Sequence, residues 1–316
     1  FMRFLKAFGV QSLIVWASCL HAQQEPQYAL SQFNHFIINP AYAGLRSGSS
    51  VLLQTRQQWI AALPPGTGPK TYGFSAHGAF KSWGFGTLVI SDQIGARSKQ
   101  QYGAALAYHL KSSSRSLVSF GVSASVKQYQ FKVPDYFLKV NEPSWVNMNS
   151  DPMLNIDAGV YFKNDRYFAS VSVTQLNTGT VMLGGSALSP LTYIIEPHYI
   201  GMSGRSFVLS EQMVLSTVAQ CRFTRNSWNA ELQLHALYGK WISAGLFYRY
   251  QNGIGFLFQT LWSNGFRVAY SFELNPSNWI YLGSTHELGI GMDLGKLSAL
   301  RSNESGKIRA TVPRFL

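Results

Sequence analysis

Hydrophobic and polar residues alternate with a period of two along most of the chain from Ser50 onward. The segment 227–238, SWNAELQLHALY, shows the pattern: Leu232 and Leu234 fall on one side of an extended chain, and Glu231 falls on the other. Such alternation predicts β-strands with one apolar face and one polar face. Segments of this kind are about ten residues long, as membrane-crossing strands are.

Counting the alternating segments predicts about fourteen strands. They are expected at 50–59, 71–80, 83–92, 101–111, 116–130, 153–163, 166–176, 197–207, 211–224, 227–238, 241–250, 253–262, 265–274 and 284–295. Short turns follow the second, fourth, sixth, tenth and twelfth strands. Longer loops are expected near 60–70, 92–100, 131–152, 177–196 and 275–283. An even number of strands, with tight turns at one end and long loops at the other, is the pattern of an outer-membrane barrel.

Composition supports lipid on the apolar side of these strands. Charged residues make up 13% of the chain, about half the roughly 25% of an average soluble protein. The mean hydropathy is −0.01, and beyond the N-terminus no apolar run approaches the roughly 18 residues that a transmembrane helix needs. A soluble β-sandwich also alternates, but it needs more surface charge and shorter strands. We therefore expect an all-β fold, a transmembrane antiparallel β-barrel of about 14 strands, since a closed sheet satisfies every backbone hydrogen bond in hydrocarbon.

Residues 2–22 have the layout of a secretory signal, with Arg3 and Lys6 before an apolar centre and small residues. Cleavage is expected after Ala22, with lipidation at Cys19 as the alternative. We expect four parts: a signal peptide at 1–22, an N-terminal segment at 23–49, the barrel at 50–297 and a polar C-terminal tail at 298–316. Export would leave Cys221 as the one cysteine of the mature chain, so no disulfide is expected.

The formal net charge of +12 and the pI near 9.7 could indicate a nucleic-acid partner. Export argues against nucleic acid, and the basic residues are scattered rather than clustered. The positive charge instead suits acidic lipid headgroups, such as those of outer-membrane lipid and lipopolysaccharide, or an acidic protein partner.

A compact motif precedes the first strand. An extended residue before proline and a glycine able to take positive φ predict a tight turn here. The motif consists of Asn39, Pro40, Ala41, Tyr42, Ala43 and Gly44. We expect the turn to dock against Arg56 and Trp59 and to act as a short plug-like segment at the periplasmic end, although a binding site is the alternative.

Several stretches closely resemble the PorP/SprF family, outer-membrane components associated with type IX secretion and gliding in the Bacteroidota. These are SQFNHFIINPAYAG, TRQQWIAALPPG, GFGTLVISDQIGARSKQQYGAALAYHLK, LVSFGVSASVKQYQF, SAGLFYRYQNGIGFLF and STHELGIGMDLG. The resemblance covers about Gln27 to Leu297 and is most specific in its first hundred residues. The segment from about Phe131 to Pro152 departs from the family pattern.

The resemblance carries individual positions over to this chain. They are Ser31, Gln32 and Asn39 to Gly44 in the N-terminal motif, Arg56, Gln58 and Trp59 on the first strand, Asp92 and Gly95 in a loop, Tyr248 and Arg249 on a later strand, and Glu287 on the last. It implies a barrel that helps secreted adhesins or other cargo, carrying a C-terminal sorting domain, to reach and stay on the cell surface. The implied partners are outer-membrane and periplasmic lipoproteins of the secretion system.

No constellation of residues indicates catalysis, a cofactor or a metal. The seven histidines show no HExxH or other two-histidine ligand spacing, and residues 184–186 do not form a nucleophile elbow. An enzyme at the barrel rim would need a histidine beside a serine or aspartate, which no spacing here supports. We therefore expect a protein that is not an enzyme.

The charged residues of the strands lie mainly on the polar face, where buried charges must be paired. We expect a charge network in the lumen, with substrate binding as the alternative. Its members are Arg56, Arg249, Arg267, Glu231, Glu273, Glu287 and Asp293. A general solute porin is the main alternative function, because a barrel of this size can leave a lumen. However, the polar face is rich in Gly, Ser and Ala, which favours a filled interior, and the loops at 131–152 and 177–196 are candidate contact surfaces for partners.

Overall fold

The structure, a computed structural model, describes residues 25–46, 48–62, 67–113, 115–131, 148–186, 189–239, 241–250, 253–275 and 279–294. The expected signal peptide, its cleavage after Ala22, the alternative lipidation at Cys19 and the C-terminal tail lie outside these residues. No helix in the described part of the chain is long and apolar enough to cross a membrane.

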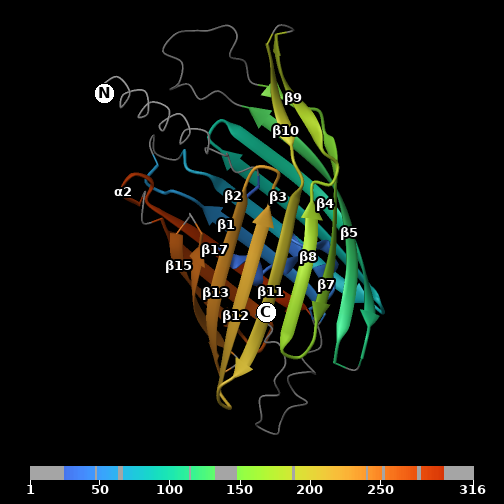
Figure 1. The fold of residues 1–316 in the computed structure, drawn as a ribbon, viewed down its shortest axis with the longest axis vertical. Helices are drawn as coiled ribbons and strands as arrows, with labels where there is room; N and C mark the ends of the chain where they lie inside the picture. Colours follow the sequence, from blue (N-terminus) through green and yellow to red (C-terminus); the bar gives the residue numbers. More distant parts are fainter. Residues whose placement is uncertain are drawn as a thin grey trace, which may run out of the picture.

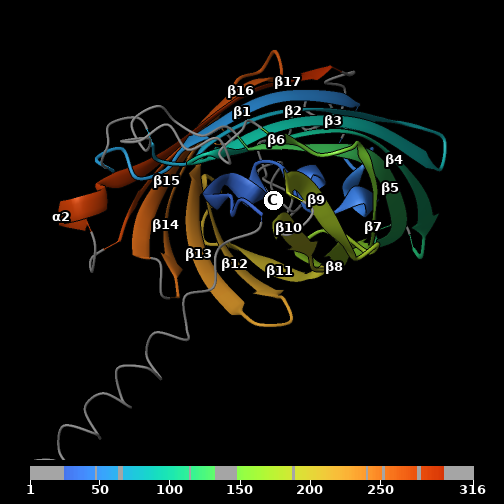
Figure 2. The ribbon, with the colours of Figure 1, turned by 90° about the horizontal axis from the view of Figure 1, so that it is seen from above.

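Fourteen antiparallel strands close into a single barrel, which Figures 1 and 2 show from two directions. They are β1 (Ser49–Gln57), β2 (Lys70–Phe80), β3 (Trp83–Ile94), β4 (Arg97–Lys111), β5 (Leu117–Phe131), β7 (Met153–Lys163), β8 (Tyr167–Thr174), β11 (His198–Val208), β12 (Met213–Phe223), β13 (Trp228–Tyr238), β14 (Ile242–Arg249), β15 (Gly253–Leu261), β16 (Phe266–Leu274) and β17 (Ser284–Leu294). Pairing of β1 with β17 closes the ring. All the predicted strands are thereby confirmed.

The strands alternate in burial as their sequences predict. On β13, Leu232 and Leu234 are exposed on the outside, whereas Glu231 and Gln233 are buried inside. Large apolar side chains cover the outer face of the other strands in the same way. A continuous apolar belt of this size on a closed sheet suits hydrocarbon rather than water. The polar face therefore lines the lumen, as the sequence pattern indicates.

The two ends of the barrel differ, and we name them by their connections. The turn end carries short connections, such as those at 81–82, 164–166 and 209–212. The loop end carries the longer ones and three small elements: β6 (Met148–Asn149), the hairpin of β9 (Gly179–Ser186) with β10 (Ser189–Ile195), and α2 (Trp279–Leu282). In Figure 1 the β9–β10 hairpin rises above the barrel.

The long loop expected near 92–100 is wrong. β3 continues to Ile94 and β4 begins at Arg97, so the connection is a tight turn in which Gly95 has φ of 57°. β4 and β5 are each 15 residues long, beyond the roughly 9–11 residues needed to cross a bilayer. The loop-side end of β4, residues 97–101, is polar on both faces because both faces leave the membrane there, so the alternation that marks a strand disappears.

The depth of an outward-facing leucine in the bilayer determines how much a charged substitution lowers the free energy of unfolding. Leu232 is 59% exposed near the middle of β13, and Leu294 is 51% exposed at the end of β17. We expect Leu232→Arg to lower the free energy of unfolding by about 2–4 kcal/mol, and the matched Leu294→Arg by about 0–1 kcal/mol. Urea unfolding of the protein in phospholipid vesicles measures both values. Equal costs at the two positions would contradict lipid on this face.

Candidate functional site: the occupied lumen

Residues 25–46 lie inside the barrel, and we call them the luminal segment. Figure 2 shows this segment, in blue, within the ring of strands. It contains three short 3-10 turns: η1 (Ala29–Gln32), η2 (His35–Ile37) and η3 (Pro40–Tyr42). The segment begins at the loop end, where Glu25 contacts Lys99 and Lys127, and finishes at the turn end, where Arg46 pairs with Asp293. The chain thus runs through the whole length of its own lumen before β1 begins.

The tight turn of the motif has the local geometry that its residues favour. Asn39 is extended, with φ of −145° and ψ of 112°, ahead of Pro40, and Gly44 has φ of 75°. The Asn39 side chain accepts a hydrogen bond from the Ala41 backbone N–H at 2.9 Å. Its amide group donates to the backbone oxygen of Val160 at 3.2 Å. The asparagine thus caps η3 and fastens the turn to β7 at the same time.

The expected docking of this turn against Arg56 and Trp59 is wrong, because η3 packs on β3, β4, β5 and β7 instead. The Gly44 backbone N–H donates to His77 Nδ1 at 3.1 Å. Ser119 Oγ donates to the backbone oxygen of Ala41 at 2.6 Å. Arg56 does not contact the turn because its guanidinium already forms ion pairs with carboxylates on β16 and β17.

Glycines in the wall make room for the turn. A Cβ at Gly121 would overlap the backbone of Pro40 and Ala41, and one at Gly159 would overlap the Asn39 side chain. The sequence shows a polar face rich in small residues, but it does not show which of them the luminal segment approaches. Inward-facing glycine on β5 and β7 is the signal that could have indicated the docking surface.

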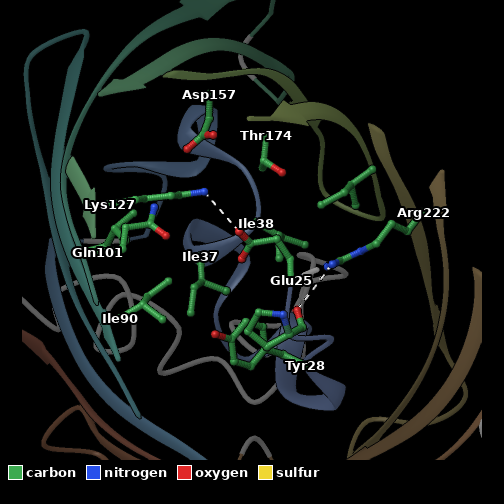
Figure 3. Close-up of a pocket in the computed structure, with 13 residues that line it drawn as sticks. Glu25, Tyr28, Ile37, Ile38, Ile90, Gln101, Lys127, Asp157, Thr174 and Arg222 are labelled. Atoms are coloured by element: carbon green, nitrogen blue, oxygen red, sulfur yellow. Dashed lines mark hydrogen bonds and ion pairs between the residues drawn. The ribbon is translucent and has the colours of Figure 1, made fainter. Parts of the chain in front are cut away.

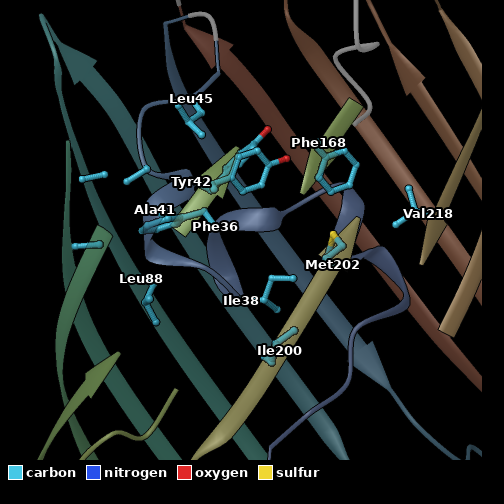
Figure 4. Packing of buried hydrophobic residues seen from close by; sticks show 14 of the residues in the cluster. Phe36, Ile38, Ala41, Tyr42, Leu45, Leu88, Phe168, Ile200, Met202 and Val218 are labelled. Carbon is cyan, nitrogen blue, oxygen red and sulfur yellow. The ribbon is translucent and has the colours of Figure 1, made fainter. Parts of the chain in front are cut away.

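Apolar side chains of the luminal segment form a core with the inner wall. Figure 4 shows Phe36, Ile38 and Tyr42 packed among wall residues such as Leu88 and Met202. A second cluster joins side chains of η1 and its flank to β1, β14, β15 and β16. Its members are Ala29, Leu30, Phe33, Leu52, Phe247, Leu257 and Ala269. Burial of a large apolar side chain stabilises the folded state by about 1.5–3 kcal/mol. The lumen is therefore packed like the hydrophobic core of a folded domain.

His35 lies in the centre of the first apolar cluster. Its Nδ1 is 2.9 Å from the hydroxyl of Tyr161, and its ring packs on Tyr42 and Phe168. His35 therefore behaves as a packed, hydrogen-bonded core residue.

Glu287 on β17 links the luminal segment to the barrel wall. Its carboxylate accepts hydrogen bonds from the backbone N–H groups of Ala29 at 2.8 Å and Leu30 at 3.0 Å. The same carboxylate pairs with Arg56, its direct partner across the β1–β17 pair. One buried acid thus satisfies two donors of η1 and one guanidinium.

The ion pairs continue from Arg56 to the neighbouring strands. Glu273 lies 3.5 Å from Arg56 and 2.8 Å from Arg249, and Arg249 also pairs with Glu231 at 2.5 Å. All these side chains are buried. The structure therefore brings together five of the charged residues that the sequence places on the inner face, in a network of Arg56, Arg249, Glu231, Glu273 and Glu287.

Arg267 and Asp293 form a separate cluster near the turn end. They lie 3.5 Å apart, and Asp293 also pairs with Arg46 of the luminal segment at 3.3 Å. Arg267 donates to the backbone oxygen of Phe33 at 2.9 Å and stacks over the Phe33 ring at 4.4 Å. The expected network is thus two clusters, and each one contacts the luminal segment.

The other residues singled out from the sequence lie apart from the turn. Gln58 and Trp59 follow the end of β1 at the loop end, and Trp59 has φ of 57°. Asp92 lies on β3 and accepts a hydrogen bond from Thr71 at 2.7 Å. A Cβ at Gly95 would meet no atom within 4 Å. The structure therefore does not join these four positions with the motif turn.

Sequence reasoning missed a third charged cluster, at the loop end of the lumen. Glu25 accepts hydrogen bonds from Lys99 at 2.5 Å, from Lys127 at 3.1 Å and from Gln175. Burial raises the pKa of Glu25, but the positive charges of Lys127 and Lys99 outweigh burial and hold that pKa well below its ordinary value. The signal in the sequence is two lysines on the inward parity of adjacent strands, which need an anion between them.

The chemistry of the described lumen is that of packing and ion pairing. In the part of the chain that the structure describes, no three His, Cys, Asp or Glu side chains gather as metal ligands. Cys221 is a free, partly buried thiol on β12. The apolar and ion-pair clusters of the described lumen are suited to holding a polypeptide segment or a charged group.

Comparisons with known proteins agree with this architecture. The family model for "Type IX secretion system membrane protein PorP/SprF" matches residues 20–292. No match was found among curated proteins. The solved CymD monoaromatic hydrocarbon channel is similar, with a TM-score of 0.50, 10% identity, and coverage of 85% of this chain and 94% of CymD. A Pseudomonas aeruginosa FadL homologue gives a TM-score of 0.47, 9% identity, and coverage of 83% and 93%. At such low identity, the likeness to CymD shows the barrel fold alone.

Substitution of one wall glycine should unseat the luminal segment. In Gly121→Val the new side chain overlaps the backbone of Pro40 and Ala41, whereas a Cβ at Gly201 meets no atom within 4 Å. We expect Gly121→Val to lower stability by about 1–3 kcal/mol and to make residues 25–46 cleavable by chymotrypsin in detergent. Gly201→Val, the matched control, should resist cleavage like the unmodified protein. Equal resistance of both variants would show that the segment does not depend on this contact.

Proposed function

The chain belongs to the PorP/SprF family of type IX secretion system membrane proteins, and we propose that it binds secreted adhesin-type cargo and holds it at the cell surface. In this proposal the chain is exported by its N-terminal signal peptide, resides in the outer membrane and acts without catalysis. Its partners are the cargo, through a C-terminal sorting domain, and outer-membrane and periplasmic lipoproteins of the secretion system.

The single observation that carries this proposal is the occupied lumen. Two apolar clusters and two ion-pair clusters fill the space with the protein's own residues 25–46. A general porin needs a water-filled channel lined by polar or charged side chains. With the interior committed to packing, the parts left for a partner are the two ends of the barrel.

The loop end offers the more suitable surface for a protein partner. Extracellular loops of bacterial barrels are the longer ones, so this end is assigned to the cell exterior. The β9–β10 hairpin there forms a two-stranded sheet of its own, and among the described residues neither outer edge pairs with another strand. An unpaired edge can accept an extended segment of another protein as an added strand. We therefore assign the hairpin as a contact for cargo.

Copurification tests this function. The protein, tagged and extracted from native outer membranes in detergent, should bring down a secreted surface protein together with secretion-system lipoproteins. Replacing residues 179–195 by a short Gly-Ser linker should reduce cargo recovery at least tenfold while the barrel still folds. A matched control replaces the turn 209–212 at the opposite end and should retain cargo. Recovery of the barrel alone, from cells that produce cargo, would contradict the proposal.

Conductance separates this function from the porin alternative. The unmodified protein should show little ion conductance in planar bilayers, because the luminal segment fills the channel. Deletion of residues 31–44 removes the motif turn, most of the segment's contribution to the first apolar cluster and Phe33 from the second, so it should open a conducting pore. Unchanged low conductance of the deletion variant would contradict the plug role, and a high conductance of the unmodified protein would favour the porin.

A further inference from the structure

At the loop end of the lumen, the buried Arg222 forms no ion pair within 4.0 Å in the described part of the chain, although the charge of Glu25 acts on it from farther away. Three cations, Lys99, Lys127 and Arg222, are 1%, 2% and 7% exposed. Glu25 pairs with the two lysines. Arg222 has no carboxylate within 4.0 Å in the described part of the chain, and its nearest acceptor is the backbone oxygen of Pro26 at 3.5 Å. Figure 3 shows Arg222 pointing toward this group from the opposite wall.

Two further buried acids at this end, Asp92 and Asp157, form no ion pair with Arg222 in the described part of the chain. Asp92 accepts a hydrogen bond from Thr71 at 2.7 Å. Asp157 is buried in the same region, but its oxygens accept hydrogen bonds from Ser123 at 2.9 Å, from the Asn155 side chain at 2.9 Å and from the Gln175 backbone at 2.9 Å. Burying a charge without a direct partner is strongly destabilising. Arg222 is therefore the one of these three cations that forms no ion pair in the described part of the chain, and a bound anion would give its guanidinium a direct partner.

Unused hydrogen-bond donors border the same space. The Nε of Arg222 and the hydroxyl of Tyr28 are buried and have no hydrogen-bond partner among the described residues, and both residues line the cavity of Figure 3. Leaving a buried donor without a hydrogen-bond partner is unfavourable. A bound acceptor with two or three oxygens would satisfy them.

The cavity has the size and lining of a small-anion pocket. Its volume is about 50 Å³, more than a single water needs. Two acids, Glu25 and Asp157, and two cations, Lys127 and Arg222, border its polar side together with Tyr28, and apolar residues such as Ile38 border the other. An oxyanion that carries a short apolar part suits such a lining, whereas a nucleotide is too large.

We propose that this pocket binds a small oxyanion, a carboxylate or phosphate group, between Arg222 and Lys127 beside Glu25. Arg222 and Tyr28 donate hydrogen bonds to the anion, and Lys127 supplies a second positive charge. Glu25 already shows that a carboxylate is held here, and it competes with the added anion for the lysines. This site is independent of cargo binding by the β9–β10 hairpin.

Calorimetric titration of the purified protein in detergent, in a chloride-poor buffer, tests the proposal. The probes are acetate, inorganic phosphate and glutamate blocked at both backbone ends. Saturable binding of at least one probe is expected. Binding of acetate and blocked glutamate without phosphate identifies a carboxylate, such as an acidic side chain of a polypeptide; binding of phosphate identifies a free or lipid-borne phosphate group. Absence of saturable binding of all three probes would overturn the proposal.

Three variants and a control locate the site. Arg222→Gln should weaken binding at least tenfold, and Tyr28→Phe should weaken it severalfold while removing only one hydroxyl. Glu25→Gln should tighten binding severalfold, because it removes the competing carboxylate; a purely structural role of Glu25 would not give this sign. Arg225→Gln changes an exposed arginine three residues from Arg222 and should bind like the unmodified protein. Equal affinities of Arg222→Gln and Arg225→Gln would overturn the assignment to this pocket.

Discussion

The pairing of β1 with β17 is the contact on which the rest of the structure depends. It turns an open sheet into a ring, so that every strand has two neighbours and no backbone edge faces lipid. Arg56 and Glu287 face each other across this pair. Because Glu287 also accepts the backbone N–H groups of Ala29 and Leu30, closure of the barrel and seating of the luminal segment use the same carboxylate. Neither can be lost without disturbing the other.

Each strand of this barrel has a different environment on each of its two faces. Lipid covers the outer side chains, and a folded stretch of the protein's own chain covers many of the inner ones. The inner wall therefore obeys the packing rules of a protein core: apolar clusters interdigitate, charges are mostly paired, and glycine appears where backbone approaches backbone. This explains a composition that is poor in charge and rich in small residues on the polar face. A lumen built for solutes would need water where this one has Phe36 and Tyr42.

Much of the fold could be predicted from the sequence, because a period of two reports directly on a strand with two environments. The prediction failed near 92–100, where the strand ends leave the membrane and both faces become polar. The turn at Asn39 and Gly44 was predictable from local backbone chemistry, whereas its docking surface was not. That surface depends on Gly121 and Gly159, far away in the sequence. The division of the charges into clusters could not be predicted from the sequence either, because it depends on partners that are distant in the chain, such as Arg56 and Glu287. The same holds for Glu25, which contacts lysines on β4 and β5.

The direction in which the luminal segment runs restricts how the molecule can be assembled. Glu25 lies at the loop end, whereas the luminal segment joins β1 at the opposite end. The closed barrel therefore encircles a segment of its own polypeptide. If the ring were completed first, everything upstream of Glu25 would have to be drawn lengthwise through it. The simpler order is that the sheet curls around residues 25–46 while a gap remains between the first and last strands. In that order of assembly, the luminal segment is the template around which the barrel closes.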